Sequence, residues 1–122
     1  MIVIPLGEER TEPDPLVPGN HLIGKDSDLS PEELWERSRG HWPLRADVAG
    51  NHSHVAYQRN AKIVLVAKIG RVVASPSPNK IVFEGEPLSD EDPFARLLVG
   101  KASHWHRPHY LTDDELAQII TG

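Results

Sequence analysis

The sequence contains no cysteine, which excludes a disulfide framework, a thiol nucleophile and a cysteine-ligated zinc or iron–sulfur centre. It also has no apolar run near the ~20 residues that a membrane-spanning helix requires. The first residues, Met1–Leu6, have no basic group and include a proline, so they do not resemble a signal peptide. These absences predict a soluble, cytoplasmic protein with no membrane partner.

The chain has 122 residues, of which 39% are hydrophobic, and this is enough for one domain with a modest core. Four prolines lie among the acidic residues of the first twenty positions. We therefore expect residues 1–20 to be an extended or flexible lead-in that contains a short strand over Ile2–Ile4. Residues 21–122 are predicted to form the single domain.

The net charge of −5 conceals a strong segregation of charge along the chain. Residues 1–36 carry nine acids and two bases, whereas residues 37–80 carry eight bases and only Asp47 as an acid, a net charge of +7. If the basic residues share a face, they form a cationic surface for phosphate or another anion. The alternative is that they solvate the edges of a sheet and discourage edge pairing.

Two helices are predicted from capping signals at Ser30 with Glu33, where the helix ends at Gly40, and at Thr112 with Glu115. A short helix is expected over residues 94–98. The β-branched run 63–74, interrupted by Gly70, predicts two adjoining strands or one strand with a bulge.

Residues 80–85 are predicted to form the next strand, and a further strand is expected to lead from Lys101 into the histidine-rich segment. These elements predict an α+β domain, a small curved β-barrel of five or six strands with peripheral helices.

The stretch Glu33–Trp42 holds two of the three tryptophans, together with Arg37 and Arg39. Aromatic rings and guanidinium groups so close together can stack on and hold a planar polar ligand. Trp35, Trp42 and Trp105 are candidates for a stacking platform, and Arg39 for a bidentate contact to a phosphate or a base carbonyl. The alternative is that Trp35 and Trp42 are core residues that close one end of the barrel.

Between residues 30 and 103 the chain contains, in order, the motifs Leu34-Trp35, Ser38-Arg39-Gly40-His41-Trp42, Gly70-Arg71-Val72-Val73, Phe83-Glu84-Gly85-Glu86-Pro87 and Val99-Gly100-Lys101. They resemble motifs of small PUA-like modules related to the ASCH, EVE and YTH domains. The resemblance implies a barrel of five or six strands and a pocket that accepts a nucleobase, often a modified one. Some ASCH-type relatives are small hydrolases or nucleases, but their Gly-x-Lys-x-x-Glu signature is not found here.

Five of the seven histidines lie in Asn51–His54 and His104–His109. On a strand, His104 and His106 would share a face, as ligands of one zinc or copper ion must. A third ligand would require the loop to fold back, so we predict no metal site and no cofactor. No nucleophile elbow, phosphate-binding glycine loop or HExxH motif is present to align a catalytic serine or histidine.

The sequence therefore predicts a module that binds DNA or RNA, with one base, modified or unmodified, in an aromatic pocket and the basic segment along the backbone. One alternative is a small ASCH-like hydrolase or nuclease that uses His104, His106 and Lys101. Another is an accessory domain whose acidic surface contacts a protein partner. The predicted nucleic-acid-binding residues are Trp35, Arg39, Trp42, Arg45, Lys62, Lys101, Trp105 and His106.

Overall fold

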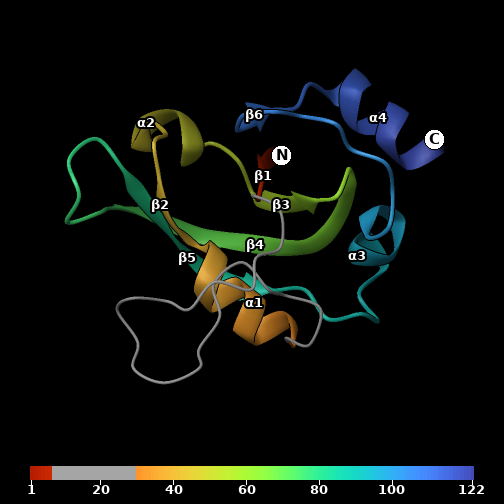
Figure 1. Cartoon of the computed structure of the whole chain (residues 1–122), viewed down its shortest axis with the longest axis horizontal. Coiled ribbons are helices and arrows are strands. Elements are labelled where there is room, and N and C mark those ends of the chain that lie inside the picture. Colours follow the sequence, from red (N-terminus) through yellow and green to blue (C-terminus); the bar gives the residue numbers. More distant parts are fainter. Residues whose placement is uncertain (7–29) are drawn as a thin grey trace.

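Six strands pair into one mixed sheet in the order β2-β5-β4-β3-β1-β6, which curls into a half-barrel (Figure 1). The computed structural model describes residues 1–6 and 30–122. In this part of the chain the elements are β1 (Ile2–Pro5), α1 (Pro31–Ser38), β2 (Gly40–Trp42), α2 (Ala46–Ala49), β3 (His54–Arg59), β4 (Lys62–Ala74), β5 (Ile81–Pro87), α3 (Pro93–Leu98), β6 (His109–Tyr110) and α4 (Asp113–Thr121). The predicted α+β class and curved sheet are confirmed, although the sheet is open, with β2 and β6 at its edges.

The first strand lies inside the sheet. β1 pairs in parallel with β3 and antiparallel with β6, and Ile2, Val3 and Ile4 are completely buried. A strand that is covered on both faces needs apolar residues at every position, which explains the uninterrupted Ile-Val-Ile. These residues therefore belong to the core of the domain rather than to a lead-in. The rest of the predicted lead-in, residues 7–20, lies outside the described residues.

A bulge bends the longest strand. The register of β4 against β5 shifts between Ile69 and Arg71, which confirms the irregularity expected at Gly70. On β5, a Cβ atom at Gly85 would lie 2.0 Å from the Lys68 carbonyl oxygen. Only glycine at position 85 therefore allows the two backbones to approach so closely at the bend.

The capping residues define the helix starts as predicted. The Ser30 hydroxyl accepts a hydrogen bond from the Glu33 amide at 3.2 Å, and α1 ends at Ser38 with Arg39 as its C-cap. At α4, the Thr112 hydroxyl accepts from the Glu115 amide at 3.2 Å, and the Glu115 carboxylate accepts from the Thr112 amide at 3.0 Å. Both are complete capping boxes, so each helix start is stabilised locally.

Two apolar clusters cover the opposite faces of the sheet, because side chains alternate along each strand. The Trp35 face is the buried cluster of Ile2, Ile4, Leu34, Trp35, Val55, Tyr57, Leu65 and Phe83. The Trp105 face is the cluster of Val3, Ala56, Ile63, Val66, Leu98 and Leu111, against which Trp105, Leu116 and Ile119 pack. The helices α3 and α4 thus lie on the side of the molecule that carries Trp105 (Figure 1).

The strand expected between Lys101 and the histidine-rich segment does not form. The segment makes only an isolated bridge between Lys62 and Ala102 before the short β6. The expectation that His104 and His106 share one face of a strand is therefore wrong. Instead of a neighbouring strand, the side chain of Gln58 makes hydrogen bonds with the backbone of Trp105.

Candidate functional site

The three tryptophans do not form a single platform. Trp35 is only 3% exposed, and its ring meets Tyr57 edge to face with centroids 6.2 Å apart. Trp42 is half-buried beside the same tyrosine, at 6.4 Å, and its indole N–H donates to the Ser38 carbonyl oxygen at 2.6 Å. Trp35 and Trp42 are therefore brought together as predicted, but as packed residues of the Trp35 face. Trp105 belongs to the opposite face of the sheet.

Tyr57 lies between these two tryptophans and is completely buried. Burial raises the pKa of its hydroxyl, and the nearby Trp42 indole lowers that pKa by less. Because the Trp42 N–H donates to Ser38, the Tyr57 hydroxyl has no hydrogen-bond partner among the described residues. The hydroxyl stays protonated and does not supply a base.

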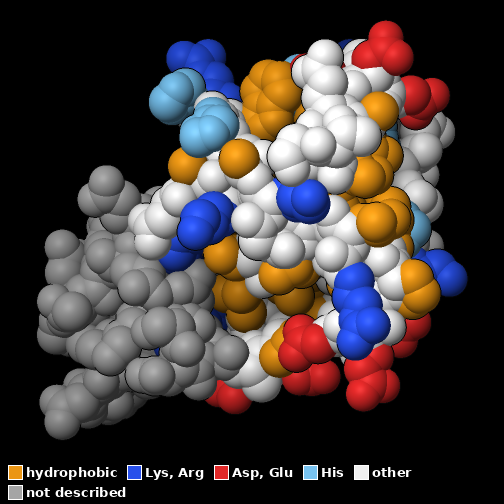
Figure 2. All heavy atoms as spheres, turned by 90° about the vertical axis from the view of Figure 1, so that its right-hand side faces the viewer, with side chains coloured by type: hydrophobic (Ala, Val, Ile, Leu, Met, Phe, Trp, Pro, Cys, Tyr) orange, Lys and Arg blue, Asp and Glu red, His pale blue; other side chains and the backbone are white. Residues whose placement is uncertain are grey.

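The basic residues of the central segment do not form one free cationic surface. Arg39 lies 3.3 Å from the Glu36 carboxylate, and Arg45 lies 2.8 Å from that of Asp47. Arg71 is paired with Glu84. Lys62 is exposed at the other end of β4, up to about 30 Å from Arg71 along the strand. Figure 2 shows the side of the molecule that carries α3 and α4, where lysine and arginine side chains appear as separate spots among exposed hydrophobic ones.

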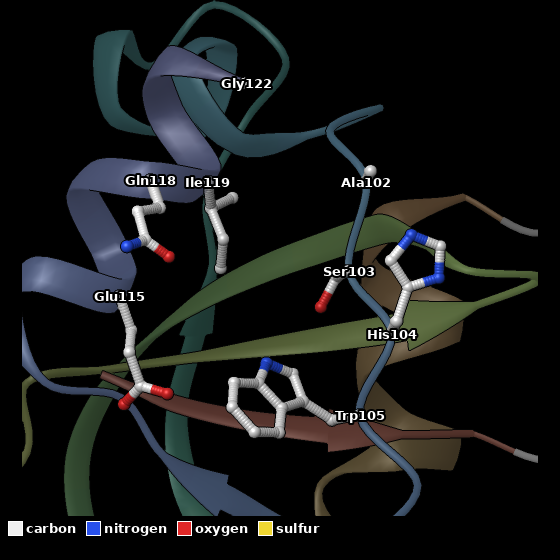
Figure 3. A pocket seen from close by; sticks show the side chains of 8 residues that line it. All are labelled: Ala102, Ser103, His104, Trp105, Glu115, Gln118, Ile119 and Gly122. Atoms are coloured by element: carbon white, nitrogen blue, oxygen red, sulfur yellow. The ribbon is translucent and has the colours of Figure 1, made fainter.

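A groove of about 390 Å³ opens on the Trp105 face, between α4 and the segment that precedes β6. Figure 3 shows the indole of Trp105 between Glu115 on one side and Ser103 and His104 on the other. Gln118 and Ile119 approach from α4. We call this the α4 groove, and its lining residues are Ala102, Ser103, His104, Trp105, Glu115, Gln118, Ile119 and Gly122.

Gln58 of β3 fixes the segment that carries Trp105. Its side-chain N–H donates to the Trp105 carbonyl oxygen at 2.9 Å, and its side-chain oxygen accepts from the Trp105 amide at 3.0 Å. The Ser103 hydroxyl donates to the same oxygen at 2.7 Å. Gln58 alternates with Tyr57 along β3, so its side chain is directed to the Trp105 face. The floor of the groove is thus attached to the sheet.

His109 supports the Trp105 ring. The two rings stack with centroids 3.7 Å apart and an interplanar angle of 15°. Nε2 of His109 lies 3.1 Å from both carboxylate oxygens of Glu115. Hydrogen bonds from the Thr112 amide and then from His109 hold the pKa of Glu115 below its ordinary value, so the groove contains an ionised carboxylate at neutral pH.

The two rims of the α4 groove differ in charge. The segment from Lys101 to His109 carries Lys101, Arg107 and three histidines without an acid, whereas α4 begins with Asp113, Asp114 and Glu115. His104, His106 and Arg107 are exposed, and the Lys101 ammonium group donates to the Gly122 carbonyl oxygen at 3.2 Å. The rim formed by the segment from Lys101 to His109 therefore suits an anion, and the rim formed by α4 suits a hydrogen-bond donor.

The described groups in the groove are better suited to binding than to nucleophilic chemistry. Ser103 donates its proton to Gln58 rather than to a histidine, so the hydroxyl is not activated. Within residues 1–6 and 30–122, no group of three or more histidine or acidic side chains is arranged to hold a metal ion. His104 is exposed, and no described side chain orients its ring.

Of the predicted site residues, Trp105 alone lines the α4 groove as described. Lys101 and His106 lie next to lining residues in the sequence, and Lys101 also donates to Gly122. Lys62 is linked to this region by its backbone bridge to Ala102. Trp35, Trp42, Arg39 and Arg45 lie elsewhere. The sequence reasoning missed Gln58 and Gln118, because no motif marks them, and it assigned Glu115 only a capping role.

Comparisons with protein-family models, with curated proteins and with solved structures each give no significant match to this chain. In the part of the chain that the structure describes, no helix is both long and apolar enough to cross a membrane.

Proposed function

We propose that this domain binds single-stranded nucleic acid by stacking one base on Trp105 in the α4 groove. The observation that carries the proposal is the fixed indole, held by stacking with the His109 ring and through its backbone by Gln58. A base stacked on an aromatic side chain contributes about 1–3 kcal/mol to binding, and a ring that is already ordered loses little entropy in the process.

The rims of the groove support an assignment of roles. Phosphates of the bound strand would lie along the acid-free rim, beside His104, His106 and Arg107. The edge of the stacked base would face Glu115 and Gln118 of α4, which offer a carboxylate acceptor and an amide. A groove of about 390 Å³ has room for one base with its sugar, rather than for a duplex.

The curled six-stranded sheet with helices at its margins supports the further proposal that the domain is a PUA-like module. The resemblance of the short motifs adds to that support. The base-binding residues proposed here differ from those predicted from the motifs, because Trp35 and Trp42 are packed against Tyr57. We therefore place the base pocket on the Trp105 face and not on the Trp35 face.

The test is fluorescence anisotropy with short labelled oligonucleotides of deoxyribose and ribose type, single-stranded and duplex, over a series of salt concentrations. Single strands should bind more tightly than duplexes, and the affinity should fall as salt rises. Trp105→Leu should weaken binding about tenfold or more, because it removes the stacking surface. The matched control is Trp42→Phe, which changes a tryptophan on the other face of the sheet.

Arg107→Ala should weaken binding to all sequences alike and reduce the salt dependence by about one phosphate contact. If Trp105→Leu binds as well as the wild type, the proposed site is wrong. Cleavage of the oligonucleotide on a denaturing gel would favour the hydrolase alternative. A stoichiometric protein partner, found in the absence of any oligonucleotide affinity, would favour the accessory-domain alternative.

A further inference from the structure

A second groove, of about 580 Å³, lies between the start of α2 and the hairpin that joins β4 to β5. We call it the hairpin groove. It shares no lining residue with the α4 groove, and the hairpin and α4 lie at opposite ends of the molecule (Figure 1). Its lining residues are Pro43, Leu44, Arg45, Ala46, Ala74, Ser75, Ser77, Pro78, Asn79, Lys80 and Ile81.

Hydrogen bonds hold the hairpin wall in place. The Ser75 amide donates to the Lys80 carbonyl oxygen at 3.0 Å, which closes the turn, and the Ser77 amide donates to the Ser75 hydroxyl oxygen at 3.0 Å. The Ser75 hydroxyl also contacts Nδ1 of His41 on β2. The wall is therefore bonded to the sheet as well as within itself, and the Ser75 hydroxyl has a defined position.

The lining of the hairpin groove contains two cations and no carboxylate. Arg45 is held on one edge by Asp47, with Nε 3.2 Å from one carboxylate oxygen and Nη2 2.8 Å from the other. This contact uses two of the five N–H groups of the guanidinium and leaves the Nη1 edge available. Among the described residues, the Lys80 ammonium group has no ion-pair partner.

We infer that the hairpin groove binds a phosphate group, with the free edge of Arg45 and the Lys80 ammonium as the charged contacts. A planar guanidinium matches the oxygen atoms of a phosphate in pairs, and a lysine adds a mobile point charge. Ser77 and Asn79 supply neutral donors beside them. Pro43 and Leu44 form an apolar wall for the uncharged part of the ligand.

The phosphate can belong to a small molecule or to a nucleic-acid backbone, and two probes separate these sources. The first is inorganic pyrophosphate. The second is an abasic single-stranded oligonucleotide, which has phosphates but no bases for Trp105. Binding is followed by the backbone amide resonances of Ser77, Asn79 and Lys80 in two-dimensional NMR spectra of the full chain.

At least one probe should shift these resonances in a saturable way, and Arg45→Ala with Lys80→Ala should weaken that binding about tenfold or more. Lys68→Ala, which removes an exposed lysine of β4 outside the groove, should leave it unchanged. A response to pyrophosphate alone assigns the site to a small ligand, and a response to the oligonucleotide assigns it to a backbone. If neither probe shifts these resonances at millimolar concentration, or if the double variant binds as well as the wild type, the inference is wrong. Because both substitutions lie on exposed side chains, loss of folding does not confound the result.

Discussion

The side-chain amide of Gln58 bonds both backbone groups of Trp105, at 2.9 Å to its carbonyl oxygen and at 3.0 Å from its N–H. A neighbouring strand would normally supply these two bonds. Here a single glutamine does so and accepts a third hydrogen bond, from Ser103, at 2.7 Å. The tryptophan at the floor of the α4 groove is thus positioned by β3, although the segment around it has no regular structure.

Gln58→Leu should destabilise the domain by about 2–3 kcal/mol, because it leaves the partly buried backbone groups of Trp105 and the buried Ser103 hydroxyl without partners. Urea unfolding measures the stability, and amide hydrogen exchange at Trp105 measures the local loosening, which should increase. Ser103→Ala removes only one of the three bonds and should cost about 1 kcal/mol. Equal stability and unchanged exchange in Gln58→Leu would show that Gln58 does not hold the segment.

Tyr57→Phe should be neutral or stabilising by about 1 kcal/mol, because the hydroxyl is buried with no hydrogen-bond partner in the part of the chain that the structure describes. The ring and its contacts with Trp35 and Trp42 stay in place. Thermal or urea unfolding provides the measurement, and Tyr110→Phe, at a half-buried tyrosine, serves as the comparison. A loss of more than about 1 kcal/mol in Tyr57→Phe would mean that the hydroxyl is hydrogen-bonded in solution.

Gly85→Ala should destabilise the domain by about 3 kcal/mol or more, because the new Cβ atom meets the Lys68 carbonyl oxygen, which is backbone and cannot move aside. Gly40→Ala provides a contrast, since its Cβ atom meets the side chain of Val82 at 2.7 Å. Adding Val82→Ala should relieve the Gly40→Ala variant in a double-mutant cycle. If Gly85→Ala and Gly40→Ala both lower the free energy of unfolding by a similar, small amount, the close approach of β4 and β5 is contradicted.

The stability contribution of Glu115 should depend on pH. Its pKa is held below the ordinary value of 4.5 in the folded protein, chiefly by the Thr112 amide and then by His109. A depressed pKa stabilises the folded state above the unfolded-state pKa, and this contribution is lost as the pH falls through the folded-state value. The difference in unfolding free energy between the wild type and Glu115→Gln should therefore shrink between about pH 5 and pH 3.

The matched control for this titration is Asp114→Asn, in the same helical turn, whose carboxylate makes no hydrogen bond within the described part of the chain. It removes a negative charge from the first turn of α4 but none of the hydrogen bonds of Glu115. A difference between wild type and Glu115→Gln that stays constant with pH would contradict the assigned hydrogen bonds.

Local signals predicted much of the fold. The capping boxes at Ser30 and Thr112 and the bulge at Gly70 each depend on a few neighbouring residues, and all three are present. The strand β3 was not predicted, because its last two residues, Gln58 and Arg59, are polar yet buried. Their burial depends on residues far along the chain, which no local pattern reveals.

The candidate site was predicted only in part for the same reason. Trp105 was identified from its type and its basic neighbours, but its separation from Trp35 and Trp42 depends on which face of the sheet each side chain occupies. Gln58 and Glu115 reach Trp105 and His109 through contacts between separate elements. The sequence also could not show that Arg39 and Arg71 of this segment would lie beside Glu36 and Glu84, which belong to the neighbouring stretches of the chain.

The most direct test of the central proposal uses the three indole N–H resonances in a two-dimensional NMR titration with a single-stranded oligonucleotide. The proposal predicts that the Trp105 resonance shifts progressively with added oligonucleotide, because a base stacks on its ring. The Trp35 and Trp42 resonances should stay in place, since both rings pack on the opposite face of the sheet. Shifts of Trp35 or Trp42 with an unmoved Trp105 would contradict the account.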